Sequence, residues 1–209
     1  MTDVAATGAP RPRPRARAAA ILLHGRGGSA EDMLALAQEF GQRDIAYLAP
    51  EAPRGSWYPY SFLAPLEQNA PHLGDALAAV GAAFAQLARE GYSERVALIG
   101  FSQGGCLALE YAARNARRYG AVVGLSAGLI GPPGTPRDYA GSFAGTPVFL
   151  GCSDIDSHIP LERVHETRDV LGRMGAAVTE RVYPGMGHTV NADEIAHARA
   201  LLAGLTSMP

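Results

Sequence analysis

Hydrophobic positions along the chain follow two patterns, short continuous runs and longer stretches with an apolar residue at every third or fourth position. Continuous apolar runs of about four to eight residues are typical of buried strands. Six short segments look like strands, and all but the last are mainly continuous apolar runs: AAAILLH (18–24), IAYLAP (45–50), RVALIGF (95–101), AVVGLSA (121–127), PVFLGC (147–152) and VTERVYP (178–184). Most of them are followed by a stretch of the second pattern, so the predicted strands are separated by helices.

The helical patterns show where those helices begin and end. They cover residues 29–40, 71–91, 160–175 and 192–204, and a further helix begins near Gln103. The first has a capping signature, because Ser29 is followed three residues later by Asp32, and the pattern ends before Gly41. Strands that alternate with helices predict an α/β fold, in which a mostly parallel sheet is covered by helices on both faces.

Three segments lie outside this alternation. Residues 1–17 are rich in proline and arginine, which predicts a disordered arm, and residues 18–209 are predicted to form a single domain. Residues 51–70 and 131–147 show neither apolar pattern. Loops longer than about 12 residues are uncommon unless they serve a site. We therefore expect these two segments to determine which substrate is bound.

Composition and charge exclude several functions. The formal net charge of −2 gives no field for binding nucleic acid or an anionic membrane surface. All 18 basic residues are arginines, so Schiff-base chemistry and nucleotide binding through a P-loop lysine are excluded.

The cysteine content and the lengths of the apolar runs bear on the cellular compartment of the protein. The chain has two cysteines, each inside an apolar run, so neither a disulfide framework nor a cysteine-rich metal site is expected. No run approaches the roughly 20 apolar residues of a membrane span, and the N-terminus is a poor match to a signal peptide. A cytoplasmic protein without stable membrane insertion is predicted.

A serine between glycines follows the third predicted strand. In Gly100-Phe101-Ser102-Gln103-Gly104 the spacing is that of the nucleophile elbow, a tight strand-to-helix turn that exposes the serine hydroxyl. Such a serine needs a histidine as base, and the histidine needs an acidic partner. His188 follows the last predicted strand, and Asp154 and Asp156 follow the fifth. The spacing does not choose between the two aspartates.

Other residues are candidates for oxyanion and substrate binding. The glycine-rich bend after the first strand offers the main-chain N–H of Arg26, and the elbow offers that of Gln103. His24 is expected to support this bend by hydrogen bonding. Four aromatic residues on the 51–70 segment are predicted to form a substrate-binding wall, with a plug in the core as the alternative: Trp57, Tyr58, Tyr60 and Phe62.

Together these motifs resemble the carboxylesterase/phospholipase family of small α/β-hydrolases, which includes the acyl-protein thioesterases. The resemblance extends from Ala18 to the C-terminus, and its motifs are His24-Gly25-x-Gly27, Trp57-Tyr58, the glycine-flanked block at 100–105, an aspartate four residues before Pro160, and Gly185-Met186-x-His188. It implies an α/β-hydrolase fold without a large cap domain. It also selects Asp156 as the acid, which completes a triad with Ser102 and His188.

The resemblance implies a serine hydrolase that cleaves small carboxylic esters or thioesters through an acyl-enzyme, with no cofactor and no metal. A peptidase or a lactone-type hydrolase with the same triad is the alternative, and a non-catalytic ligand-binding α/β-hydrolase is another. His158 and His165, near two aspartates, raise the question of a metal site, but structural or exposed histidines are favoured because no dense ligand cluster accompanies them. The sequence leaves a homodimer open.

Overall fold

Six parallel strands form the central sheet of this protein, whose computed structural model describes residues 16–207. The strands lie in the order β2-β1-β3-β4-β5-β6, and all five neighbouring pairs are parallel. Their bounds are β1 Ala18–Leu23, β2 Ile45–Leu48, β3 Val96–Phe101, β4 Ala121–Leu125, β5 Pro147–Ser153 and β6 Ala177–Tyr183. The predicted mostly parallel sheet is confirmed. The arm predicted from the first residues lies almost wholly outside the described part of the chain.

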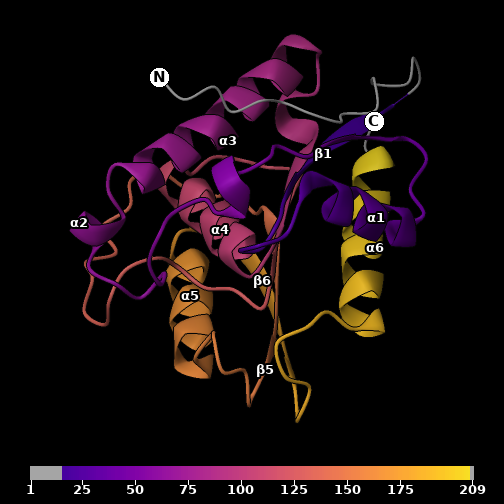
Figure 1. Ribbon diagram of the computed structural model, residues 1–209. Coiled ribbons are helices and arrows are strands. Elements are labelled where there is room, and N and C mark those ends of the chain that lie inside the picture. Colours follow the sequence, from indigo (N-terminus) through magenta and orange to yellow (C-terminus); the bar gives the residue numbers. More distant parts are fainter. Residues whose placement is uncertain (1–15, 208–209) are drawn as a thin grey trace.

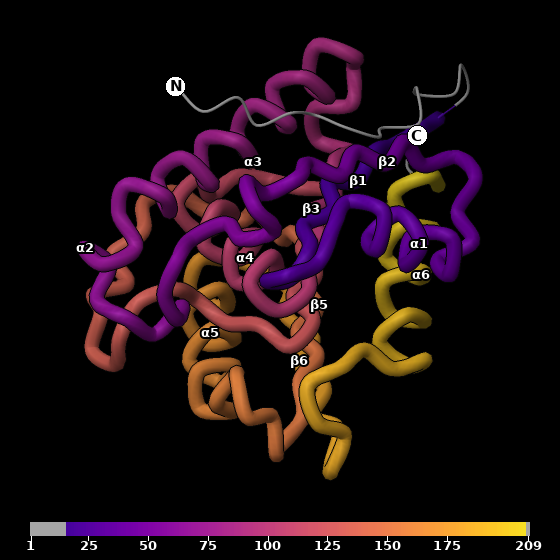
Figure 2. Tube along the Cα trace, in the orientation of Figure 1, coloured from indigo at the N-terminus to yellow at the C-terminus, as the bar shows by residue number. Residues whose placement is uncertain are grey.

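Helices cover both faces of the sheet, as predicted (Figure 1). The helices are α1 Ala30–Phe40, α2 Leu66–Asn69, α3 His72–Arg89, α4 Gln103–Arg114, α5 Leu161–Arg173 and α6 Ala192–Thr206, with 3-10 turns η1 at Pro53–Gly55 and η2 at Ser93–Arg95. Helices α1 and α6 pack together on one face, and α3, α4 and α5 lie on the other. The tube in Figure 2 shows β1 and β3 between these two helix layers.

Side-chain alternation along each strand supplies both layers of the core. In β1, Ala19, Ile21 and Leu23 pack under α3 and α4, while the alternate residues face α1 and α6. Every residue of β1 is buried, because a parallel strand in the middle of the sheet has helices on both sides. This explains why the strands appear in the sequence as continuous apolar runs.

The helix ends follow their sequence signals closely. Ser29 caps α1 in a reciprocal capping box with Asp32, and Gly41 ends the helix in the left-handed conformation, with φ of 63°. The 51–70 segment is not wholly irregular, since it contains η1 and α2. Both elements are too short to show a helical period in the sequence.

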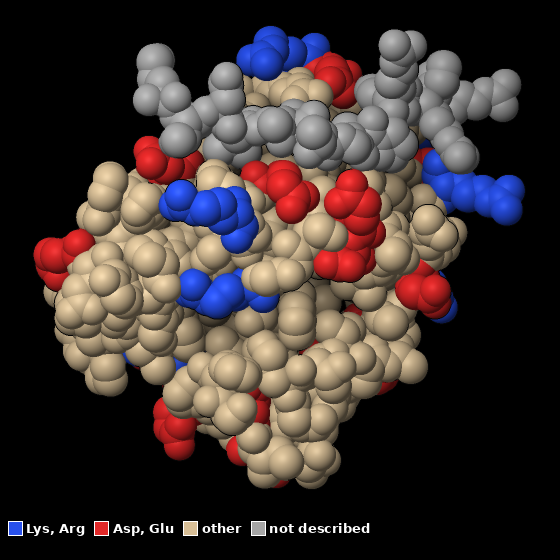
Figure 3. Space-filling model, in the orientation of Figure 1, with Lys and Arg blue, Asp and Glu red and all other residues tan. Residues whose placement is uncertain are grey.

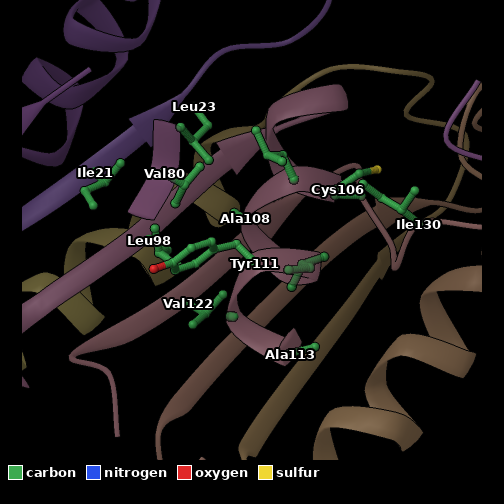
Figure 4. Packing of buried hydrophobic residues seen from close by; sticks show 14 of the residues in the cluster. Ile21, Leu23, Val80, Leu98, Cys106, Ala108, Tyr111, Ala113, Val122 and Ile130 are labelled. Carbon is green, nitrogen blue, oxygen red and sulfur yellow. The ribbon is translucent and has the colours of Figure 1, made fainter. Parts of the chain in front are cut away.

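Glycines allow α4 to lie close against the sheet behind Ser102. A Cβ atom at Gly104 would overlap the carbonyl of Leu23 in β1, and one at Gly105 would lie 2.6 Å from the Cβ of Ala127. Beyond this contact, α4 presents apolar side chains to the strands. Figure 4 shows residues of α3, α4 and the strands meeting in one apolar cluster. The close packing fixes the N-terminus of α4 relative to β1.

Among residues 16–207, no helix combines the length and the apolar composition that a membrane crossing requires. Cys106 and Cys152 are buried free thiols, as the sequence predicts.

A buried carboxyl group lies at the start of α6. Glu194 completes a capping box with Asn191, whose N–H donates to one carboxylate oxygen at 2.8 Å. The other oxygen lies against Gly151 of β5 and has no hydrogen-bond partner among the described residues. The pKa of Glu194 is raised from 4.5 to about 7, chiefly by burial, with a smaller raising effect of nearby Asp193 and an opposing, lowering effect of the Asn191 N–H.

Glu194→Gln is expected to remove a pH dependence of stability. The folded protein holds the Glu194 proton more tightly than the unfolded chain, so the free energy of unfolding falls as pH rises from about 4.5 to about 7. The fall amounts to at most about 3 kcal/mol. Glutamine keeps the capping box and stays neutral. Urea denaturation at pH 5 and pH 8 checks this, with Glu31→Gln in α1 as control for loss of one helix-start charge. An unchanged fall in the Glu194→Gln variant would contradict the assignment.

Candidate active site

Ser102 lies on the sharp turn between β3 and α4. Its backbone has φ of 53° and ψ of −121°, a conformation that residues other than glycine rarely adopt. Gly100 allows the turn, because a Cβ atom there would overlap the backbone of Gly104. The Ser102 N–H donates to the carbonyl of Leu125 at 2.9 Å, and its carbonyl accepts from Cys106 in α4. These contacts hold the backbone in a strained conformation at the carboxyl edge of the sheet.

Three side chains from separate loops form one hydrogen-bonded row. His188 follows β6, and its Nε2 atom lies 2.9 Å from the Ser102 Oγ atom. Its Nδ1 atom lies 2.7 Å from Oδ2 of Asp156, which follows β5. A carboxylate only accepts, so Nδ1 carries the proton and Nε2 is left to accept from the serine hydroxyl. The structure thus places the predicted nucleophile, base and acid in contact and in the required order.

Asp156 is held as a carboxylate beneath His188. Its side chain is fully buried, while that of His188 is 19% exposed. Burial by itself raises the pKa of Asp156, but hydrogen bonds from His188 and from the N–H groups of His158 and Ile159 outweigh it and hold the pKa below its usual value. The two N–H groups donate to Oδ1 at 2.8 and 3.0 Å. The charged form is therefore oriented by three donors.

Asp154 lies in a different environment from Asp156. Its Oδ1 atom accepts from the N–H of Gly185 at 2.7 Å, whereas the hydrogen bond to His188 comes from Asp156. Ser153 makes a similar link, accepting from the N–H of Gly187 at 3.2 Å. Ser153 and Asp154 therefore tie the end of β5 and the loop after it to the backbone of the His188 loop.

An open cavity of about 570 Å³ lies beside Ser102. Tyr58, Tyr60 and Phe62, three of the four residues predicted to bind substrate, line this cavity. Figure 3 shows a hollow on the viewed face of the molecule, with basic side chains beside it. Trp57 does not line this cavity: its indole N–H donates to the carbonyl of His24 at 2.8 Å, and its ring lies 5.1 Å from that of His24. Trp57 therefore fits the alternative of a plug in the core.

Two main-chain N–H groups near Ser102 are available to a ligand. Those of Arg26 and Gln103 have no hydrogen-bond acceptor within residues 16–207, and both residues line the cavity. His24 supports the bend before Arg26, as expected. Its Nε2 atom accepts from the N–H of Ala52 at 3.0 Å, so Nδ1 donates to the carbonyl of Gly25 at 2.7 Å.

Sequence reasoning missed part of the cavity. Cys106 and Ile159 line it, and neither was among the residues expected at the site. The helical spacing could have indicated Cys106, because it lies one turn after Ser102 on the same face of α4. Burial raises the pKa of the Cys106 thiol to about 12, so the thiol is an apolar wall and not a second nucleophile.

His158 and His165, the two histidines considered as metal ligands, lie in different surroundings. His158 is exposed at the cavity, with its ring 4.7 Å from that of His188, and His165 pairs with Glu180 at 3.0 Å. Within residues 16–207, no three side chains of histidine, cysteine, aspartate or glutamate come together as a metal site would need.

Comparison with known proteins identifies relatives along most of the chain. The phospholipase/carboxylesterase family model matches residues 10–205. Acyl-protein thioesterase 1 of Gibberella zeae is 30% identical over 118 residues, which are 52% of this chain and 47% of that protein. The chain therefore spans about half the length of the curated relatives it matches.

Solved structures match over a larger share of the chain. The phospholipase/carboxylesterase of Dyadobacter fermentans is 44% identical, with a TM-score of 0.87, over 90% of this chain and 91% of that chain. Esterase PE8 is 25% identical, with a TM-score of 0.79, over 94% of this chain and 96% of that chain. Both structures share the arrangement of strands and helices described above.

Proposed function

The chain belongs to the phospholipase/carboxylesterase family, a family of α/β-hydrolases, and from this premise we propose that it cleaves carboxylic esters or thioesters through a Ser102-His188-Asp156 triad. The main support is the continuous hydrogen-bonded row from the Ser102 hydroxyl through the imidazole to a buried carboxylate. A serine hydroxyl becomes a useful nucleophile only when a base removes its proton. This row supplies that base and the group that orients it.

In the acylation half of the reaction, the Ser102 oxygen attacks the carbonyl carbon of the substrate. The hydroxyl proton passes to Nε2 of His188 and from there to the departing alcohol or thiol, as the bond to that group breaks. Asp156 holds the proton on Nδ1 and stabilises the positive imidazolium that forms in between. Water then loses a proton to His188 and attacks the acyl carbon; the bond from that carbon to the Ser102 oxygen breaks, the acid is released, and His188 returns the proton to the serine oxygen.

The negative oxygen of each tetrahedral intermediate needs hydrogen-bond donors. We assign this role to the main-chain N–H groups of Arg26 and Gln103, which line the cavity and have no other acceptor among the described residues. Gln103 is the first residue of α4, so the helix dipole adds a favourable field at the same point. A donor of this kind typically lowers the barrier by about 3 kcal/mol.

The substrate class follows from the cavity and the relatives together. The aromatic residues Tyr58, Tyr60 and Phe62 line the cavity together with Ile159, and a lining of this kind suits an acyl group. Curated relatives are named acyl-protein thioesterase, so we include thioesters beside oxygen esters. The buried free thiols suit a reducing compartment, and we place the enzyme in the cytoplasm. A peptidase or a lactone-type hydrolase would use the same triad and differ only in the loops that contact the substrate.

Labelling with a fluorophosphonate tests the proposal directly. The probe should attach to Ser102 alone, as located by peptide mass spectrometry, and the labelled protein should no longer hydrolyse nitrophenyl butyrate or a butyryl thioester. A protein that only binds ligands has no activated serine and would stay unlabelled. Rapid cleavage of peptides or lactones with slow cleavage of esters would instead favour the alternative substrates.

A further inference from the structure

The side chain of Arg26 is bound to a short stretch of the cavity wall. One terminal nitrogen of its guanidinium donates to the Ser56 hydroxyl and to the carbonyl of Pro59, both at 2.9 Å. The other donates to the carbonyls of Tyr58 and Tyr60, at 2.9 and 2.8 Å. All four acceptors lie within residues 56–60, and three of them are main-chain carbonyls. No carboxylate within residues 16–207 pairs with this arginine.

The side chain of Gln103 binds the first part of the same 56–60 loop. Its Oε1 atom accepts from the N–H of Trp57 at 3.0 Å, and its Nε2 atom donates to the carbonyl of Tyr58 at 2.8 Å. The Tyr58 carbonyl thus accepts from both side chains. A further main-chain bond joins Gly27 to Gly55 at 2.8 Å. The two proposed oxyanion donors are therefore tied through their side chains to the loop that bears the aromatic wall.

We propose that Arg26 is a positioning residue that limits the size of the acyl group by holding the 56–60 loop against the cavity. The inference rests on the proposed esterase function and extends it to substrate size. Four donors in one rigid plane fix several backbone carbonyls at once, which a flexible ammonium group cannot do. While the loop is held, Tyr58 and Tyr60 stay at a fixed distance from Ser102, so an acyl chain longer than the cavity must displace them.

Two variants separate the bonds of Arg26 from its charge. Arg26→Met removes the guanidinium and keeps the main-chain N–H. Arg26→Lys keeps the positive charge but loses the planar set of N–H donors that the guanidinium provides. Arg54 provides the matched control. It is exposed on η1 near the same loop, and its guanidinium makes no hydrogen bond or ion pair within residues 16–207, so Arg54→Met removes an equal charge without releasing the loop.

The acyl-length profile is the first measurement. Nitrophenyl acetate, butyrate, octanoate and dodecanoate share one leaving group and differ only in the acyl chain. In both Arg26 variants we expect the ratio of kcat/KM for octanoate to that for acetate to rise by about tenfold or more. For nitrophenyl acetate, the decrease in kcat/KM should come more from a higher KM than from a lower kcat, because the oxyanion donor of Arg26 is its main-chain N–H, which both variants keep. Arg54→Met should keep the ratio of the natural protein.

Tryptophan fluorescence is a second measurement that does not depend on activity. Trp57 is the single tryptophan of the chain and lies on the tethered loop, 3% exposed. Quenching by acrylamide should therefore rise at least about twofold in both Arg26 variants and stay unchanged in Arg54→Met. This signal reports release of the loop even in a variant that hydrolyses no ester.

The outcomes distinguish the inference from the proposed function. An unchanged acyl-length profile in Arg26→Met overturns the inference, whether or not the quenching rises. A wild-type profile in Arg26→Lys also overturns it, because charge would then suffice. If no variant cleaves any ester and fluorophosphonate leaves Ser102 unlabelled, the proposed function is wrong, while the quenching still shows whether Arg26 holds the loop.

Discussion

Ser102→Ala is expected to lower the turnover of nitrophenyl butyrate by about 10⁴-fold or more, with little change in the free energy of unfolding. The variant keeps the backbone of the elbow and removes only the oxygen that would bond to the acyl group. Loss of the nucleophile from a serine triad leaves only the residual rate supplied by binding and the oxyanion donors. Ester hydrolysis, circular dichroism and urea denaturation together check this expectation.

Ser102→Gly is the informative partner of that variant. Glycine adopts the φ of 53° without the strain that a side chain imposes, so we expect it to be inactive but more stable than the natural protein by about 1 kcal/mol. An inactive glycine variant with a higher free energy of unfolding would show that the strained backbone at Ser102 lowers stability and is kept for function. Retention of a tenth or more of the activity in either variant would refute the nucleophile assignment.

Asp156→Asn is expected to lower kcat by about 10²- to 10⁴-fold, whereas Asp154→Asn should lower it by less than about tenfold. In the first variant the asparagine amide would present no negative charge to the imidazolium, and its N–H₂ group can hold His188 in the wrong tautomer. Among the residues that the structure describes, the carboxylate of Asp154 accepts only from the Gly185 N–H, and the amide oxygen of asparagine can accept that bond as well. The measurement is kcat for one ester in both variants at fixed pH.

The pair of aspartate variants also controls for general damage to the loop. The two residues lie in the same turn after β5, so a disturbance of the turn should affect both variants similarly. Equal losses in the two variants would mean that the loop, and not the carboxylate, is what His188 requires. A larger loss in Asp154→Asn would reverse the assignment of the acid.

Much of the fold was predictable because local physics decides it. A parallel strand with helices on both sides must be apolar on both faces, so β1, β3, β4 and β5 appear in the sequence as continuous apolar runs. Strand β6 has one neighbouring strand and alternates in burial, and its pattern still indicated a strand. The short elements η1 and α2 were missed because three or four residues are too few to show a period.

The candidate site was predictable only in part. The glycines beside Ser102 are needed for close packing of α4, and this requirement is visible in the local sequence. The aromatic residues at 57–62 looked alike in the sequence, but three line the cavity and Trp57 packs against His24. Which way a ring on an irregular loop points depends on the surfaces around it, and these come from distant parts of the chain.

By itself the sequence determined the α/β architecture, the elbow and the family resemblance, since these depend on side-chain period, turn chemistry and motif spacing within short windows. Only the tertiary structure decided that Asp156 contacts His188 while Asp154 holds Gly185, and that the Arg26 side chain binds the 56–60 loop. These are hydrogen bonds between residues about 30 positions apart in the chain. Their geometry is fixed only when the sheet brings the ends of separate strands to one edge.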